Sequence, residues 1–138
     1  MAAQGYIVAL DYGDKRVGVA ITHTVARLPR PLTTLENTET LLEDIRKLVT
    51  HEDAKLVVVG LPRGMDGGYT AQTKAAEMFA KKLQETLDVS VVLADETLTS
   101  VDAEGVLNGR HHQKGDVDAL AATFILDRYL ADNPAEEA

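Results

Sequence analysis

The feature that most limits how this chain can fold is a series of short apolar runs that alternate with helical patterns. Runs of strand length, rich in branched residues, lie at Tyr6–Leu10, Val17–Ile21, Leu56–Val59 and Val89–Ala94. Pro31–Leu35 is a candidate edge strand. Continuously apolar strands that alternate with amphipathic helices indicate a parallel sheet covered on both faces. The pattern therefore predicts an α/β fold.

The helical patterns between these runs are amphipathic until the last one. The first helix is predicted to carry one apolar face and to begin at an N-cap of Asn37 or Thr38; that face consists of Leu41, Leu42, Ile45, Leu48 and Val49. The apolar face of the second predicted helix consists of Ala76, Phe79, Leu83 and Leu87. Two helices are expected after the last strand. The final one, near Val117–Leu130, is apolar almost all round, so we expect it to be largely buried.

The length and composition fit one ordinary globular domain. The 138 residues are 45% hydrophobic and 26% charged. We expect a single domain over residues 1–138, with 131–138 as a disordered polar tail. The chain has no cysteine, which excludes disulfides, a thiolate metal site and a cysteine nucleophile, and which suits a cytoplasmic location. No apolar run approaches the ~20 residues that span a membrane.

The charge is unevenly distributed. A net charge of -8 argues against a protein that coats nucleic acid through a general basic field. Two segments nevertheless lack acidic residues: residues 15–35, with Lys15, Arg16, Arg27 and Arg30, and residues 105–115, with Arg110, His111, His112 and Lys114. Solvated loops explain these segments about as well as a contact with a polyanion. We expect both segments to flank the functional site.

Three carboxylates stand where a metal site can form. Asp11 ends the first strand, Glu96 follows the last, and Asp118 opens the final helix. Because sites in open sheets lie outside the carboxyl ends of parallel strands, we expect Asp11 and Glu96 at one edge. Mg²⁺ and Mn²⁺ take oxygen ligands, and two such ions can promote phosphodiester hydrolysis. Asp116 is an alternative to Asp118 as the third ligand, and each acid alone is also explained as a cap or a solvated residue.

Four blocks of sequence resemble one known family. DYGDKRVGVA from Asp11, VGLP from Val59 followed by MDG from Met65, DETLTS from Asp95 and VDALAA from Val117 occur in the order and approximate spacing of the YqgF family, also called RuvX. The resemblance extends from Ile7 to about Leu130. It implies an RNase H-like fold, in which a five-stranded mixed β-sheet begins with three antiparallel strands and carries helices on both faces.

The resemblance also implies a function and a site. Members of the family are associated with processing the pre-16S rRNA end during ribosome biogenesis, and an older description is Holliday junction resolvase. The motif positions imply a catalytic site in which Asp11, Glu96 and Asp118 hold one or two Mg²⁺ or Mn²⁺ ions. The expected partners are pre-rRNA, or alternatively branched DNA, and ribosomal particles, with no membrane.

Basic residues near the motifs are candidates for substrate contact. They are Lys15, Arg16, Arg63, Arg110 and Lys114. The loop Leu61–Gly68 contains three glycines, so its backbone can approach a substrate closely. The chain departs from the family pattern at Thr97, where many relatives have arginine, at Gly68, and in a shortened stretch before Asp118. These departures concern RNA binding and substrate choice, and they leave the proposed metal ligands unchanged.

Other classes of function fit less well. DYGDKRVGVAI also resembles the phosphate hairpin of actin-like ATPases and sugar kinases, but those proteins need a second lobe that 138 residues cannot supply. A non-catalytic RNA-binding assembly protein is a further alternative, against which the three intact acids speak. His111 and His112 lack partners for a zinc site and are better explained as part of an exposed basic loop.

Overall fold

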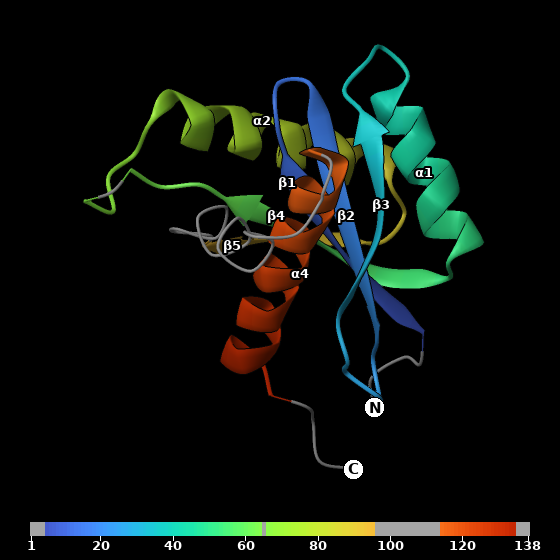
Figure 1. Ribbon diagram of the computed structural model, residues 1–138. Coiled ribbons are helices and arrows are strands. Elements are labelled where there is room, and N and C mark those ends of the chain that lie inside the picture. The colour runs from blue at the N-terminus through green and yellow to red at the C-terminus, as the bar shows by residue number, and fades with distance from the viewer. Residues whose placement is uncertain (1–4, 65, 96–113, 135–138) are drawn as a thin grey trace.

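A computed structural model of the protein describes residues 5–64, 66–95 and 114–134. The elements follow in the order β1 (Tyr6–Tyr12), β2 (Arg16–His23), β3 (Arg30–Glu36), α1 (Leu41–His51), β4 (Ala54–Leu61), α2 (Ala71–Thr86), β5 (Ser90–Asp95) and α4 (Lys114–Asp132) (Figure 1). The helix expected between the last strand and the final helix falls outside the described residues.

One five-stranded sheet, in the order β3-β2-β1-β4-β5, organises the fold. β1, β2 and β3 are antiparallel neighbours, whereas β4 and β5 run parallel to β1. This confirms the mixed sheet that the family resemblance implies, while the parallel arrangement that the apolar runs indicate is wrong for the β1–β2 and β2–β3 pairs. Apolar strands report burial on both faces and not direction. The short turn Gly13–Lys15 decides direction, because a parallel connection needs a long crossover.

The two faces of the sheet form two separate cores. On one face Val8 and Leu10 of β1 belong to the cluster that includes Ile45 of α1 and Leu83 of α2. On the other face Ile7 and Ala9 pack with residues of α4, namely Ala122, Ile125 and Leu126. Helices therefore cover both faces, with α1 and α2 behind the sheet and α4 crossing its front (Figure 1). Alternation along β1 assigns odd-numbered residues, including Asp11, to the α4 face.

The N-cap of α1 is Thr40, so the prediction of Asn37 or Thr38 is wrong. Asn37 instead fixes the β1–β2 turn, where its side-chain amide donates to the Gly13 carbonyl oxygen at 2.7 Å and its backbone N–H donates to that of Lys15 at 2.9 Å. The Thr40 side chain makes no capping bond. A polar residue beside a helical pattern can serve a neighbouring turn equally well, so residue type alone misplaced this cap.

The start of α2 is tied to the loop after β4. Thr70 and Thr73 form a reciprocal capping box, with backbone N–H to hydroxyl distances of 3.2 and 3.0 Å. The Thr73 hydroxyl also bonds to the Pro62 carbonyl oxygen. The loop that leaves β4 is therefore held against the first turn of α2.

Two expectations about the end of the chain need correction. β5 is an edge strand with partly exposed side chains, Leu93 being 42% exposed, and is not the buried strand expected. An edge strand has only one neighbour, so less of it is covered. α4 continues through Asp132, so residues 131 and 132 are helical and not part of a disordered tail. Among the described residues, no helix is long and apolar enough to cross a membrane.

Candidate active site

Asp11 and Asp118 come together through a close approach of α4 to β2. Asp11 lies opposite Gly18 in the β1–β2 register, so both residues face the same side of the sheet. A Cβ atom on Gly18 would lie 1.9 Å from the Asp118 carbonyl oxygen and 2.2 Å from its carbonyl carbon. Only glycine therefore admits the first turns of α4 at this point. The missing side chain of Gly18 brings Asp118 to the face on which Asp11 lies.

The two acids line one pocket at the carboxyl end of β1. Its volume is about 230 Å³, and the described residues that line it come from β1, the β1–β2 turn, β2, the loop after β4, α2 and α4: Asp11, Tyr12, Gly13, Asp14, Arg16, Pro62, Gln72, Ala75 and Asp118. Asp11 and Asp118 are both partly exposed. The pocket is thus open to water and large enough for a hydrated cation.

Arg16 forms an ion pair with Asp118. Its Nε atom lies 2.9 Å from Oδ2 of Asp118, and the two residues are 102 positions apart in the sequence. The side chains are 35% and 29% exposed. The sequence suggested Arg16 as a phosphate contact and gave no sign of this partner. The spacing of Arg16 and Gly18 places both on one side of β2, but nothing in the sequence connects that side to Asp118.

The other candidate substrate contacts occupy different surroundings. Lys15 is exposed in the β1–β2 turn beside the pocket. Arg63 pairs with Asp95 at 3.4 Å, which joins the loop after β4 to the end of β5. Lys114 lies in the first turn of α4, as does Asp116, but their side chains are outside the described part of the structure. Glu96, Arg110, His111 and His112 also fall outside it.

The expectation that residues 15–30 flank the site as one basic segment is wrong for Arg27 and Arg30. β2 carries the chain over about 23 Å to the opposite end of the sheet. There the Arg27 guanidinium donates to the carbonyl oxygens of Leu130 and Asn133, at 3.2 and 2.6 Å. Proximity in sequence misled the prediction, because an antiparallel strand separates its two ends by its full length.

The donor set of the pocket fits a hard divalent cation. Asp11 and Asp118 offer carboxylate oxygens, the ligand type that Mg²⁺ and Mn²⁺ prefer, and the open pocket leaves room for coordinating water. Within residues 5–64, 66–95 and 114–134, no three acidic or histidine side chains gather into a cluster that could hold a metal ion. The described pair therefore needs a further ligand, and Glu96 remains the predicted one.

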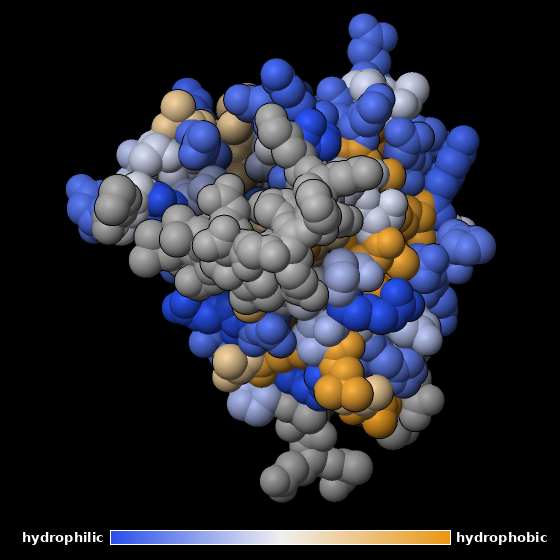
Figure 2. All heavy atoms as spheres, in the orientation of Figure 1, coloured by the Kyte–Doolittle hydropathy of each residue, from blue (hydrophilic) through white to orange (hydrophobic). Residues whose placement is uncertain are grey.

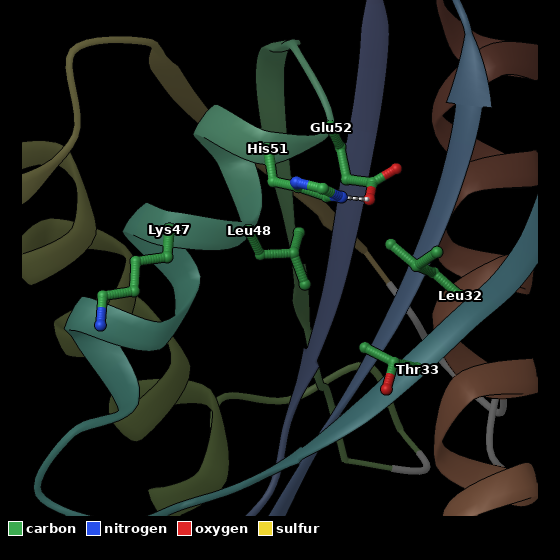
Figure 3. A pocket seen from close by; sticks show the side chains of 6 residues that line it. All are labelled: Leu32, Thr33, Lys47, Leu48, His51 and Glu52. Atoms are coloured by element: carbon green, nitrogen blue, oxygen red, sulfur yellow. Dashed lines mark ion pairs between the residues drawn. The ribbon is translucent and has the colours of Figure 1, made fainter.

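A larger hollow lies between β3 and α1, on the opposite face of the sheet from α4. Its volume is about 480 Å³, and it is lined by Leu32, Thr33, Lys47, Leu48, His51 and Glu52 (Figure 3). The ion pair drawn there joins His51 to Glu52 at 3.8 Å. Size alone does not make this hollow the active site, because Glu52 is the only carboxylate among its described lining residues. The smaller pocket combines several acids and a guanidinium.

Comparison with solved structures defines the class of fold. RuvC from T. thermophilus, in complex with a Holliday junction substrate, matches with a TM-score of 0.59 and 13% identity over 96% of this chain and 98% of that one. The fowlpox virus Holliday junction resolvase matches with a TM-score of 0.54 and 14% identity over 92% and 98%. Identities this low show the fold alone, which is the RNase H-like fold of the resolvases.

Comparison of sequences defines the family. The RuvX family model, described as Holliday junction resolvase, matches residues 5–132. Relatives named "Putative pre-16S rRNA nuclease" include one from Paraburkholderia phymatum, 37% identical over 90% of this chain and 83% of the relative. Another, from Sodalis glossinidius, is 38% identical over 97% and 99%. The chain belongs to the RuvX family, as its four sequence blocks indicated.

Proposed function

We propose that this chain is a divalent-metal-dependent nuclease that processes the end of pre-16S rRNA during ribosome biogenesis in the cytoplasm. As a hydrolase it would cut phosphodiester bonds of nucleic acid. Membership of the family and the names of its relatives support this proposal. The observation that carries it is the shared pocket of Asp11 and Asp118, since acids so far apart in sequence meet there only because Gly18 admits α4.

The described residues divide the work of such a site between them. Asp11 and Asp118 would hold one or two Mg²⁺ or Mn²⁺ ions, with Glu96 as the proposed third ligand. A bound cation supplies Lewis-acid stabilisation of the charge on the phosphate and a water of lowered pKa. Asp11 lies at the end of a buried strand and Asp118 on a packed helix, so rigid elements carry both proposed ligands.

Contacts around the pocket suit a phosphate backbone. Lys15 is exposed at the rim, and the β1–β2 turn that carries it is fixed by both hydrogen bonds from Asn37. Local cations of this kind can attract a polyanion despite a net charge of -8. Phosphate contacts position a nucleic acid without reading its sequence. These residues therefore support binding of nucleic acid, while the choice of RNA comes from the relatives' names.

A second candidate function is resolution of branched DNA. The description of the matching family model favours it. The two functions need the same metal chemistry and differ in the shape of the substrate. A direct comparison of substrates therefore separates them.

The deciding experiment compares cleavage of three substrates by the full chain in Mg²⁺ and in Mn²⁺. The substrates are a structured RNA with a pre-16S rRNA end, a single-stranded RNA and a four-way DNA junction. We expect cation-dependent cleavage of the pre-rRNA end and a loss of at least about a hundredfold in Asp11→Asn. Asp53→Asn is the matched control, because it removes the same charge at the opposite end of β1 and keeps a residue type that tolerates its φ of 56°.

Each other outcome assigns a different function. Efficient cleavage of the junction alone would replace the proposal with the resolvase function. RNA binding without cleavage in any cation would make the chain a non-catalytic assembly protein. Full activity in a folded Asp11→Asn variant would remove Asp11 from the site.

A further inference from the structure

Asp118 is contacted in two different ways from β2. The backbone of Gly18 packs against the backbone of Asp118, so closely that a Cβ atom would not fit. Arg16, two residues earlier on the same strand, contacts the Asp118 side chain through a single Nε–Oδ2 hydrogen bond of 2.9 Å. The contact of Gly18 sets how closely α4 approaches β2, whereas the contact of Arg16 pairs with the carboxylate of Asp118.

The packing of α4 accounts for its position without the ion pair to Arg16. Ala122, Ile125 and Leu126 are fully buried against the sheet. Their packing and the contact at Gly18 fix α4 on the sheet. An ion pair whose side chains are 35% and 29% exposed adds little to such packing. The function of Arg16 at this place is therefore electrostatic.

The charges of the pocket show what Arg16 balances. The described lining residues include three carboxylates, on Asp11, Asp14 and Asp118, and one cationic side chain, that of Arg16. A divalent cation held by Asp11 and Asp118 would bring two positive charges beside the guanidinium. Like charges a few ångströms apart repel even in water. A bound cation would therefore weaken the ion pair, and the guanidinium would weaken binding of the cation.

We propose that Arg16 neutralises Asp118 until a divalent cation binds, and that the released guanidinium then contacts a phosphate of the nucleic acid. The inference rests on the proposed function and adds a role for Arg16 within it. A partly exposed, singly bonded ion pair is weak enough to be exchanged. A guanidinium is well suited to a phosphate, to which it can donate two parallel hydrogen bonds.

The first test measures binding of Mn²⁺ to the full chain by calorimetry, without nucleic acid. We expect Arg16→Ala to bind Mn²⁺ about tenfold more tightly than the wild type, because the repelling charge is gone. Arg16→Gln should behave in the same way, since glutamine keeps a hydrogen-bond donor and loses the charge. Arg16→Lys should stay near the wild type. Arg30→Ala is the matched control, because the same charge is lost at the exposed far end of β3 and affinity should not change.

The second test measures binding of a cleavage-resistant phosphorothioate RNA with and without Mn²⁺. In the wild type the cation should strengthen RNA binding, and in Arg16→Ala this gain should shrink at least threefold. Thermal unfolding without metal verifies that each variant is folded, and Arg16→Gln replaces Arg16→Ala if the latter does not fold. An equal gain in the two proteins would overturn the phosphate contact.

The outcomes separate this inference from the proposed function. Weaker Mn²⁺ binding in both Arg16→Ala and Arg16→Gln would overturn the inference and make Arg16 a residue that positions a ligand. Unchanged binding in both would also overturn it. If the wild type binds no Mn²⁺, or Asp11→Asn binds it equally well, the proposed metal site itself fails, whatever the Arg16 variants do.

Discussion

Two arginines, one at the start of β2 and one in the turn between β2 and β3, contact opposite ends of the same helix. Arg16 pairs with the Asp118 side chain near the start of α4, whereas Arg27 donates to the carbonyl oxygens of Leu130 and Asn133 at its end. The last carbonyl groups of a helix lack intrahelical partners and carry partial negative charge, so the Arg27 guanidinium caps the C-terminus of α4. Arg16 instead pairs with the side chain of a residue that lines an open pocket. The same residue type thus has a structural role at one end and an electrostatic role at the other.

The surfaces at the two ends differ in the same way. At the far end, the turn between β2 and β3 exposes apolar side chains, with Val25 65% and Leu28 78% exposed, and Figure 2 shows apolar atoms over this turn. At the other end, Asp11, Asp14 and Asp118 are among the residues that line the pocket. Several carboxylates around one open pocket are a feature of sites that bind cations. The comparison therefore distinguishes the end where Arg27 holds the last turn of α4 from the end that carries the candidate site.

Gly18→Ala should have the largest effect. The added Cβ atom would overlap the backbone of Asp118, so β2 or the start of α4 has to move. We expect the free energy of unfolding to fall by about 3 kcal/mol, the upper range for overpacking, with loss of Mn²⁺ binding. Urea denaturation and calorimetry measure the two effects. A stable variant that binds Mn²⁺ normally would show that the close approach of α4 does not build the site.

Asp11→Asn should separate activity from stability. Nuclease activity should fall at least about a hundredfold, as a proposed ligand is lost. The free energy of unfolding without metal should stay equal or rise by up to ~1 kcal/mol, because repulsion between the pocket carboxylates decreases. Thermal unfolding with and without Mn²⁺ is the measurement, and the metal-induced rise in Tm should shrink in the variant. A strongly destabilised variant would assign Asp11 a structural role instead.

Arg27→Ala should give the opposite result. Losing two charge-assisted hydrogen bonds to carbonyl oxygens should lower the free energy of unfolding by about 1–2 kcal/mol, while Mn²⁺ affinity stays unchanged. Arg27 has a left-handed φ of 56° that alanine does not favour, so Arg27→Gly is the matched variant that removes the side chain without that strain. Altered Mn²⁺ affinity in both variants would break the division between the two ends.

The sequence predicted the elements of the fold better than the partners of its polar side chains. Apolar runs located the strands, because a strand that is buried on both faces has apolar side chains at nearly every position. The family resemblance singled out Asp11 and Asp118, and the fold explains their meeting through Gly18. The partner of Arg16 lies 102 residues away, and no local pattern encodes such a contact. The prediction for Arg27 is wrong because counting charges along the chain ignores the length of β2, which carries Arg27 to the opposite end of the sheet.

Asp127→Asn should have the smallest effect on stability. Asp127 lies in the C-terminal half of α4, away from the pocket. Partial burial raises the pKa of its carboxyl group above its ordinary value. The unfolded chain therefore ionises at lower pH than the folded protein, so this residue lowers stability as the pH rises through the window between the two pKa values. Below that window the cost is absent, and above it the cost is complete. At pH 7, Asp127→Asn should raise the free energy of unfolding by less than about 0.5 kcal/mol, because the residue is exposed and its carboxyl group is only partly desolvated. Urea denaturation at pH 7 and at pH 3 measures this gain, with the low-pH pair as the internal control, since both proteins are then uncharged at position 127. A gain of the same size at both pH values would show that packing, and not the charge of Asp127, causes it.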